Sequence, residues 1–307
     1  MSVINIFKGN KNQEKNTTKD GFFQEFEGTI SKAFSCKGIG VHSANDVIMK
    51  VIPELESTGI YFVRTDVKDS DNIIKASYEN VTERNMSTVI SNESGVSVST
   101  IEHIMAALEG SSVHNARIEI DGPEVPIMDG SSLEFVNLIN DSGVVVGNKK
   151  RKSIKLFKKI RVSSGESWAS LSPSLTPMFN VHFDFHKRLP NSYEFSFSPS
   201  EDSFSEVISP ARTLGFYEDA EKLWKMGLAK GSSIDNTVVI KDGKVANPEG
   251  LRFDDEMVRH KILDAIGDLS LLGVTVLANY EAYNGGHGLN NMLINELIKS
   301  EDSFAFM

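Results

Sequence analysis

The chain has 307 residues, of which 40% are hydrophobic and 24% are charged, and its net charge is -10. This length exceeds the usual size of one domain, so we expect one large or two smaller domains. The acidic balance argues against nucleic-acid binding, which needs a basic surface. No apolar run reaches the roughly 20 residues of a membrane helix, and the N-terminus lacks the apolar segment of a secretory signal. We therefore expect a cytoplasmic protein without an integral membrane segment.

The single cysteine, Cys36, limits the kinds of metal site that the chain can form. One cysteine allows no internal disulfide, no cysteine zinc cluster and no iron–sulfur site. We expect Cys36 to be a small buried packing residue. A metal would have to be held by histidine and carboxylate side chains.

The first half of the chain predicts strands followed by a helix, a strand and a second helix. Residues 1–25 are polar and predict a flexible N-terminal arm. Short apolar or alternating segments predict strands at 28–36, 46–53, 59–65 and 115–122, and a hairpin at 87–99.

The two helices expected in this half are residues 99–110 and 131–143. Ser99 with Glu102, and Ser131 with Glu134, have the spacing of a capping box. Each pair therefore predicts a helix N-terminus.

The second half repeats this order after a Gly-rich and basic stretch at 141–155, which we interpret as a linker. The expected domains are 26–146 and 147–307. The expected strands are 154–164, 167–174, 178–186, 193–199 and 273–283, with a hairpin at 237–246, and the expected helices are 218–227, 256–273 and 287–299. The pattern predicts an α+β fold with helices packed on antiparallel sheets, and the repeated order raises the hypothesis of a structural duplication.

The helix expected at 256–273 carries an unusual column of polar side chains. His260, Asp264 and Asp268 are four residues apart and stack on one face. A histidine and an aspartate at this spacing can reach the same ion, although a solvated polar face is the alternative. Catalytic zinc usually takes three protein ligands, and His103 on the first helix is the candidate for the third.

Three further residues could complete a catalytic site. Glu102 could be a general base beside a metal-bound water, but the local sequence favours its role in the capping box. His287 lies between glycines and suits a proton donor whose pKa a neighbouring Asp268 would raise, or it is an exposed loop residue. Thr213 is either a core threonine or a hydroxyl in a pocket. Together, a His/His/Asp site, a Glu base and a His acid are the groups needed to hydrolyse an amide or ester.

Six motifs, in this order between about residues 27 and 300, are similar to those of a known family. They are "GIGVHSA", "STIEHIMAAL", "PEVPIMDGSSLEFV", "ARTLGF", "NPEGLRFDDEMVRHKILDAIGDL" and "GGHGLNN". The chain resembles the UDP-3-O-acyl-N-acetylglucosamine deacetylases, zinc amidases that commit Gram-negative bacteria to lipid A synthesis. The resemblance implies two similar α+β domains, each a sheet layered on helices, with the active site between the helix layers. It also implies a βαβ insert in the second domain, from Phe216 to about Val239, which forms an apolar passage for the acyl chain.

The resemblance further implies a role for each candidate residue. Zinc, or iron(II), would be held by His103, His260 and Asp264. Glu102 would be the general base, Thr213 an oxyanion donor, Lys261 a nearby positive charge, and His287 the general acid held by Asp268. Leu214, Phe216, Asp219 and Lys261 would contact the substrate, UDP-3-O-(3-hydroxyacyl)-N-acetylglucosamine, from which acetate is released. We expect a monomer whose partner is this acylated UDP-sugar.

Two positions depart from the usual family residues. Ala44 and Leu214 stand where the family commonly has Gly and Phe. Alternatives are an amidase for another N-acyl sugar, a sugar-nucleotide binding module without catalysis, and a metal phosphohydrolase. All the proposed metal and acid–base positions are filled, and the His-Asp dipeptide common in phosphohydrolases is absent, so the deacetylase is favoured.

Overall fold

The computed structural model describes residues 24–83, 86–185, 188–189 and 191–307. The arm expected over residues 1–25 lies outside them, except for its last two residues. Among the described residues, no helix is both long and apolar enough to span a lipid bilayer.

Among the described residues, the first half of the chain contains a five-stranded sheet, a three-stranded sheet, one strand that pairs with a strand of the second half, and two α-helices. Its elements are β1 (Phe26–Ile30), β2 (Phe34–Ile39), β3 (Asp46–Pro53), β4 (Ile60–Arg64), β5 (Ile73–Lys75), η1 (Tyr78–Asn80), β6 (Val81–Glu83), β7 (Val89–Ser91), β8 (Ser97–Val98), α2 (Glu102–Gly110), β9 (Ala116–Ile120) and α3 (Leu133–Ser142). The larger sheet has the order β2-β3-β9-β4-β5.

The second half contains a seven-stranded sheet, a three-stranded sheet and the remaining helices. Its elements are β10 (Val144–Lys150), β11 (Ser153–Leu156), β12 (Ile160–Ser164), β13 (Ser167–Pro173), β14 (Met178–Asp184), β15 (Ser192–Phe197), α4 (Phe204–Val207), β16 (Leu214–Phe216), η2 (Tyr217–Asp219), α5 (Ala220–Lys225), β17 (Val238–Lys241), β18 (Lys244–Val245), α6 (Glu256–Ser270), β19 (Thr275–Tyr283), α7 (His287–Lys299), η3 (Glu301–Ser303) and β20 (Phe304–Phe306).

The strand order β2-β3-β9-β4-β5 of the first large sheet corresponds to β12-β13-β19-β14-β15 in the second, which also contains β11 and β20. β9 pairs antiparallel with β3 and parallel with β4, and β19 pairs antiparallel with β13 and parallel with β14. Parallel neighbours need a crossover connection, and α2 and α6 lie in these two crossovers. The α+β prediction is confirmed, but the sheets are mixed and not purely antiparallel. The common order supports the hypothesis of a structural duplication.

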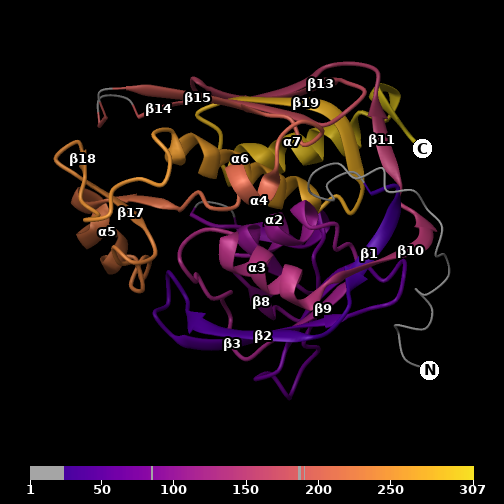
Figure 1. Ribbon diagram of the computed structural model, residues 1–307, viewed down its shortest axis with the longest axis horizontal. Coiled ribbons are helices and arrows are strands. Elements are labelled where there is room, and N and C mark those ends of the chain that lie inside the picture. Colours follow the sequence, from indigo (N-terminus) through magenta and orange to yellow (C-terminus); the bar gives the residue numbers. More distant parts are fainter. Residues whose placement is uncertain (1–23, 84–85, 186–187, 190) are drawn as a thin grey trace.

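Four layers place the helices in the middle of the molecule. Figure 1 shows the sheet with β2 and β3 on one outer side, then α2 and α3, then α6 and α7, then the sheet with β13 and β19. A βαβ unit of β16, α5 and β17 projects from one end, and its two strands are parallel. The apolar faces of both helix layers and both sheets therefore meet in one continuous core.

The two helix layers approach most closely where α2 crosses α6. A Cβ atom built on Gly267 would lie only 2.1 Å from the carbonyl oxygen of Glu102. No side chain fits in that space, so the glycine is what allows the start of α2 to rest on the middle of α6. This crossing brings Glu102 and His103 to the polar column of α6.

Several local expectations were wrong. Neither capping box forms completely. α2 begins at Glu102 without a side-chain cap, whereas Oγ of Ser131 accepts from the N–H of Leu133 at the start of α3 over 3.1 Å. The N–H of Ser131 donates to Asp129 and not to Glu134, so the second box forms only by half. The expected linker is instead a strand, β10, which pairs with β1 because its apolar residues 144–146 continue that ladder. The segment 28–36 is two strands, and the expected helix at 218–227 is only six residues long.

Candidate active site

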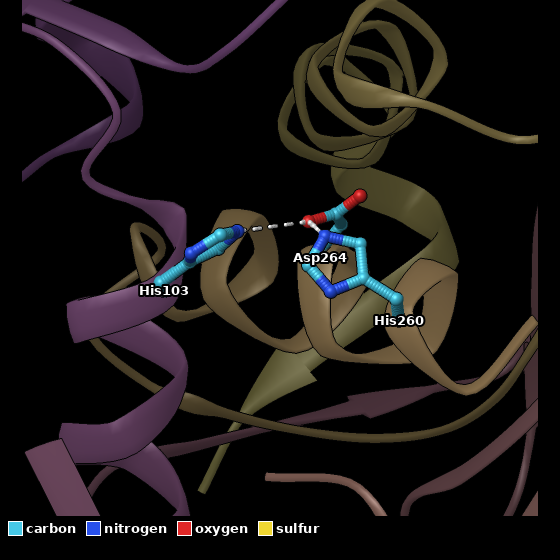
Figure 2. A group of neighbouring side chains, drawn as sticks. All are labelled: His103, His260 and Asp264. Carbon is cyan, nitrogen blue, oxygen red and sulfur yellow. Dashed lines mark ion pairs between the residues drawn. The ribbon is translucent and has the colours of Figure 1, made fainter. Parts of the chain in front are cut away.

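Three side chains from α2 and α6 form a cluster that could hold a cation. One potential ligand atom from each of His103, His260 and Asp264 lies within 4.8 Å of the other two. Nε2 of His103 is 3.9 Å and Nε2 of His260 is 3.3 Å from Oδ1 of Asp264. Figure 2 shows the two imidazoles reaching this carboxylate from different helices. The three residues predicted from the sequence to be metal ligands are thus brought together by the crossing of α2 and α6.

The polar column of α6 is buried and is not a solvated face. His260, Asp264 and Asp268 are 1%, 2% and 3% exposed. Burying such groups costs free energy unless they are paired or bind an ion. Their position between the helix layers therefore excludes the alternative of a solvated surface.

The protonation states suit metal ligation. Nδ1 of His260 lies 2.9 Å from the carbonyl oxygen of Ala211, which can only accept, so Nδ1 carries the proton and Nε2 offers a lone pair. Burial lowers the pKa of His103 to about 3, which keeps this imidazole neutral. Burial favours the neutral form of Asp264, but the electrostatic interactions with His260 and Lys261 outweigh it and hold the pKa of Asp264 below its usual range.

An unsatisfied oxygen supports the fit to a cation. Oδ1 of Asp264 is buried and has no hydrogen-bond partner among the described residues. Buried polar atoms are almost always paired, so an orphaned carboxylate oxygen facing two imidazole nitrogens needs an explanation. Two imidazoles and one carboxylate are a ligand set that zinc accepts with a position left open.

Glu102 lies beside this cluster and is buried. Its Oε2 accepts a hydrogen bond of 3.0 Å from the backbone N–H of Thr88 and does not cap α2. Burial, opposed by His287, raises the pKa of Glu102 to about 7. A carboxylate with a pKa near neutrality suits a general base.

His287, the first residue of α7, is held by Asp268. Nδ1 of His287 is 2.8 Å from Oδ2 of Asp268, and its Nε2 is 3.8 Å from Oε1 of Glu102. Burial by itself disfavours the imidazolium, but the charges of Asp268 and Glu102 outweigh burial and raise the pKa of His287 to about 10. His287 is therefore cationic at neutral pH, and its side chain is only 10% exposed.

Two residues of this network had not been singled out from the sequence. Thr88 Oγ1 donates to Oδ1 of Asp268 over 2.5 Å, and Asn290 Nδ2 donates to Oδ2 over 2.7 Å. Asn290 is three residues after His287 and hence on the same helix face, a spacing that could have identified it. Nothing in the local sequence distinguishes Thr88, because its contact joins residues 180 positions apart.

Of the two remaining candidates, Lys261 contacts the cluster directly, and Thr213 lies two residues after a backbone group that does. Nζ of Lys261 donates to Oδ2 of Asp264 over 2.8 Å. Thr213 is half-buried, and it follows the Ala211–Arg212 peptide whose carbonyl contacts His260.

Two of the substrate-contact candidates, Leu214 and Phe216, belong to a second, apolar cluster. Leu214 and Phe216 pack against buried Phe185, Leu189, Ile240 and Met257. The guanidinium of Arg188 lies 3.5 Å from the ring centre of Phe216, and its Nη1 donates to Asp219 over 2.7 Å. Nζ of Lys261 lies 5.9 Å from the ring centre of Phe183, which packs on the same cluster. The apolar cluster therefore adjoins the polar one through Lys261.

Ala44, one of the two departures, occupies a turn in the left-handed backbone region. Its φ is 59°, and its N–H donates to the carbonyl of Gly40 over 2.9 Å. Glycine adopts this conformation without steric cost, whereas alanine does not.

Comparisons with known proteins agree with this site. The family model described as LpxC, UDP-3-O-acyl N-acetylglycosamine deacetylase, matches residues 27–299. A protein of this name from Campylobacter fetus is 42% identical over 276 residues, which cover 90% of this chain and 92% of the relative. Relatives of the same name from Syntrophus aciditrophicus and Shewanella oneidensis are 40% and 41% identical, and each match covers 91% of this chain and 88% or 92% of the relative. The chain therefore belongs to the UDP-3-O-acyl-N-acetylglucosamine deacetylase family.

Proposed function

We propose that the chain is a metal-dependent deacetylase that acts in lipid A biosynthesis. It would hydrolyse the N-acetyl group of UDP-3-O-(3-hydroxyacyl)-N-acetylglucosamine to acetate and the free amine. The observation that carries this proposal is the buried cluster of His103, His260 and Asp264 beside Glu102 and the Asp268–His287 pair. Family membership and the names of the relatives support the choice of substrate.

His103, His260 and Asp264 would hold the cation, which we propose to be zinc, with iron(II) as the alternative. A divalent cation in such a site lowers the pKa of water and polarises a carbonyl group. The other residues act around it. With a pKa of about 7, Glu102 is largely deprotonated just above neutral pH and can take the proton of the water that attacks the acetamide carbon.

Negative charge develops on the acetamide oxygen as water attacks, and positively charged side chains already lie in the site before the reaction. His287 is protonated at neutral pH and lies 3.8 Å from Glu102, so it can stabilise the developing anion and then donate a proton to the leaving nitrogen. Lys261 and the hydroxyl of Thr213 would add to this stabilisation. Asp268 keeps His287 charged and oriented.

We propose that the acyl chain lies along the apolar cluster and the βαβ unit. Leu214 and Phe216 offer apolar surface there, and Asp219 and Lys261 offer polar contacts at its margin. Leu214 in place of the common Phe removes an aromatic ring from this surface. We further propose a monomer that works in the cytoplasm.

The deciding experiment is acetate release from this substrate, measured for the protein as purified, after chelation, and after zinc or iron(II) is added back. Activity that disappears with chelator and returns with one metal supports the proposal and identifies the cation. Bound metal without acetate release from any acyl variant would instead point to another N-acyl sugar, and the Leu214→Phe variant would be tested next.

A further inference from the structure

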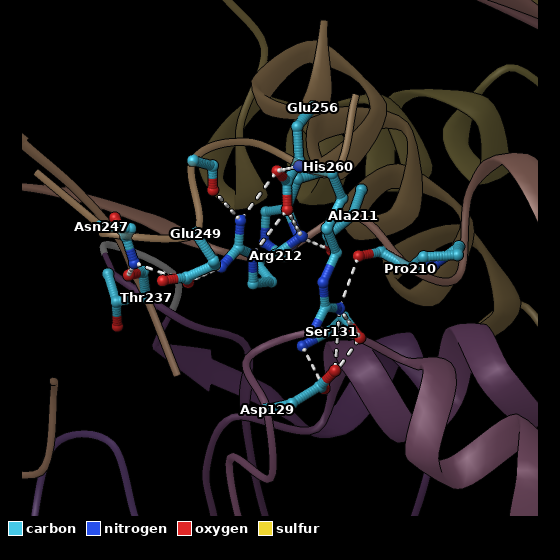
Figure 3. A network of polar contacts seen from close by, with 12 residues as sticks. Asp129, Ser131, Pro210, Ala211, Arg212, Thr237, Asn247, Glu249, Glu256 and His260 are labelled. Carbon is cyan, nitrogen blue, oxygen red and sulfur yellow. Dashed lines mark hydrogen bonds and ion pairs between the residues drawn. The ribbon is translucent and has the colours of Figure 1, made fainter. Parts of the chain in front are cut away.

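One peptide group, between Ala211 and Arg212, is held at both of its polar ends by side chains from α6. The carbonyl of Ala211 accepts from Nδ1 of His260 over 2.9 Å. The N–H of Arg212, on the same peptide plane, donates to Oε1 of Glu256 over 2.9 Å. Glu256 and His260 are one turn apart on α6, and Figure 3 shows both side chains meeting this segment.

Glu256 has a deeply buried carboxylate, and both of its oxygens accept hydrogen bonds. It is 0% exposed, and Arg212 is 2% exposed. Oε1 also accepts from Nε of Arg212 over 2.8 Å, and Oε2 accepts from Nη2 of Arg212 over 3.1 Å and from the N–H of Arg252 over 2.6 Å. The guanidinium of Arg212 therefore supplies the counter-charge that such burial requires.

Glu249 contacts the same guanidinium in a different way. Its Oε1 accepts from Nη1 of Arg212 over 2.5 Å, but its side chain is 54% exposed. Among the interactions of the described residues, none joins Glu249 to the Ala211–Arg212 peptide. Glu249 thus forms an ion pair with Arg212, as Glu256 does, but it does not contact the peptide.

A carboxylate that accepts from a peptide N–H polarises the carbonyl of that peptide. A more negative carbonyl oxygen is a better acceptor for the imidazole N–H, which fixes the tautomer and ring orientation and raises the basicity of the other nitrogen. In metal sites, a carboxylate commonly acts on histidine directly. Here the carboxylate acts on His260 through one peptide group.

We infer that Glu256 is a positioning residue that presets Nε2 of His260 for metal binding through the Ala211–Arg212 peptide. The inference rests on the proposed metal site.

Metal affinity of the whole protein tests this inference without reference to catalysis. Chelator competition with zinc would give the dissociation constant for the wild type, Glu256→Gln and the control Glu249→Gln. Glutamine is uncharged and has one acceptor oxygen where glutamate has two, so it polarises the Ala211–Arg212 peptide less than the carboxylate does, even if its oxygen still accepts from the N–H of Arg212. We expect the dissociation constant to rise about 10-fold in Glu256→Gln, the lower end of the effect of outer-shell partners, and to stay unchanged in Glu249→Gln.

The outcomes separate this inference from the proposed function. Wild-type protein that binds neither zinc nor iron(II) overturns both. If zinc binds equally tightly to the wild type and to Glu256→Gln, the carboxylate of Glu256 has only a structural role, even where the variant melts at a lower temperature. That result overturns this inference and leaves the proposed function standing. If Glu256→Gln does not fold, Glu256→Asp is tested in its place. This variant keeps the negative charge, but its shorter side chain moves the carboxylate away from the peptide. In that variant, metal-free ¹⁵N NMR of His260 should show Nε2-protonated tautomer that the wild type lacks, and an unchanged spectrum overturns the inference.

Discussion

Replacing Asp268 with Asn should move the alkaline limit of activity to lower pH. Asp268 is the largest of the charges that raise the pKa of His287, which reaches about 10 from an ordinary value of 6.5. A difference of this size corresponds to roughly 5 kcal/mol of preference for the imidazolium. An opposite charge in direct contact supplies about 1 to 3 pKa units, so the variant should lose about 2 units or more.

The sign of the effect follows from the direction of the shift. A raised pKa means that the favourable interaction with His287 is complete below pH 6.5 and is lost as pH rises through about 10. In Asp268→Asn the loss begins at lower pH, so acetate release should fall above roughly pH 8 while the wild type stays active. The metal content should not change, because Asp268 is not among the candidate ligands.

The assay is the pH dependence of kcat for acetate release, together with metal analysis of the same samples. Glu296→Gln is a matched control, because it removes an exposed carboxylate from α7, the helix that carries His287. An alkaline limb that stays in place in Asp268→Asn would refute the assignment of His287 as the cationic group. Loss of metal from this variant would refute the assignment of Asp268 and His287 to acid catalysis and not to metal binding.

Three further predictions concern the metal cluster and the glycine and alanine positions. His260→Ala should remove bound metal, whereas His287→Ala should retain it and slow turnover; equal metal content in both variants, measured by atomic absorption, would contradict this. Gly267→Ala places a Cβ 2.1 Å from the Glu102 carbonyl, so α2 and α6 must separate, with a loss of about 1 to 3 kcal/mol in unfolding free energy and weaker metal binding. Ala44→Gly should stabilise the fold by about 0.5 to 1 kcal/mol in urea denaturation, since relief of strain at a φ of 59° exceeds the entropy cost of glycine; a destabilised variant would show that this turn is not strained.

The helix periodicity in the sequence was sufficient to locate α6 and α7. Residues 287–299 were predicted as a helix and form α7 with those bounds, because apolar residues recur at helical spacing there. Helix N-termini were less predictable. The Ser99–Glu102 spacing indicated a cap, but the carboxylate of Glu102 accepts instead from the backbone N–H of Thr88, which the fold brings alongside.

The identity of the site residues was also readable from the sequence, through motifs that resemble the family. The roles assigned to Glu102, Lys261 and Asp268 from that resemblance remain predictions. Their positions in the structure are compatible with those roles, since each lies within hydrogen-bonding or ion-pair distance of the candidate cluster or of His287.

By itself, the sequence determined the composition of the site: one histidine on α2, and a histidine and two aspartates in register on α6, because residues four apart share a helix face. Only the tertiary structure decided that this face is buried, that α2 crosses it at Gly267, and that Thr88 and Asn290 donate hydrogen bonds to it. It also decided that Glu256 holds the peptide group that His260 contacts. Those contacts join segments far apart in the chain, and no local pattern encodes them. Burial between the helix layers is also what shifts the pKa values of Glu102 and His103, since desolvation depends on surrounding atoms and not on neighbours in sequence.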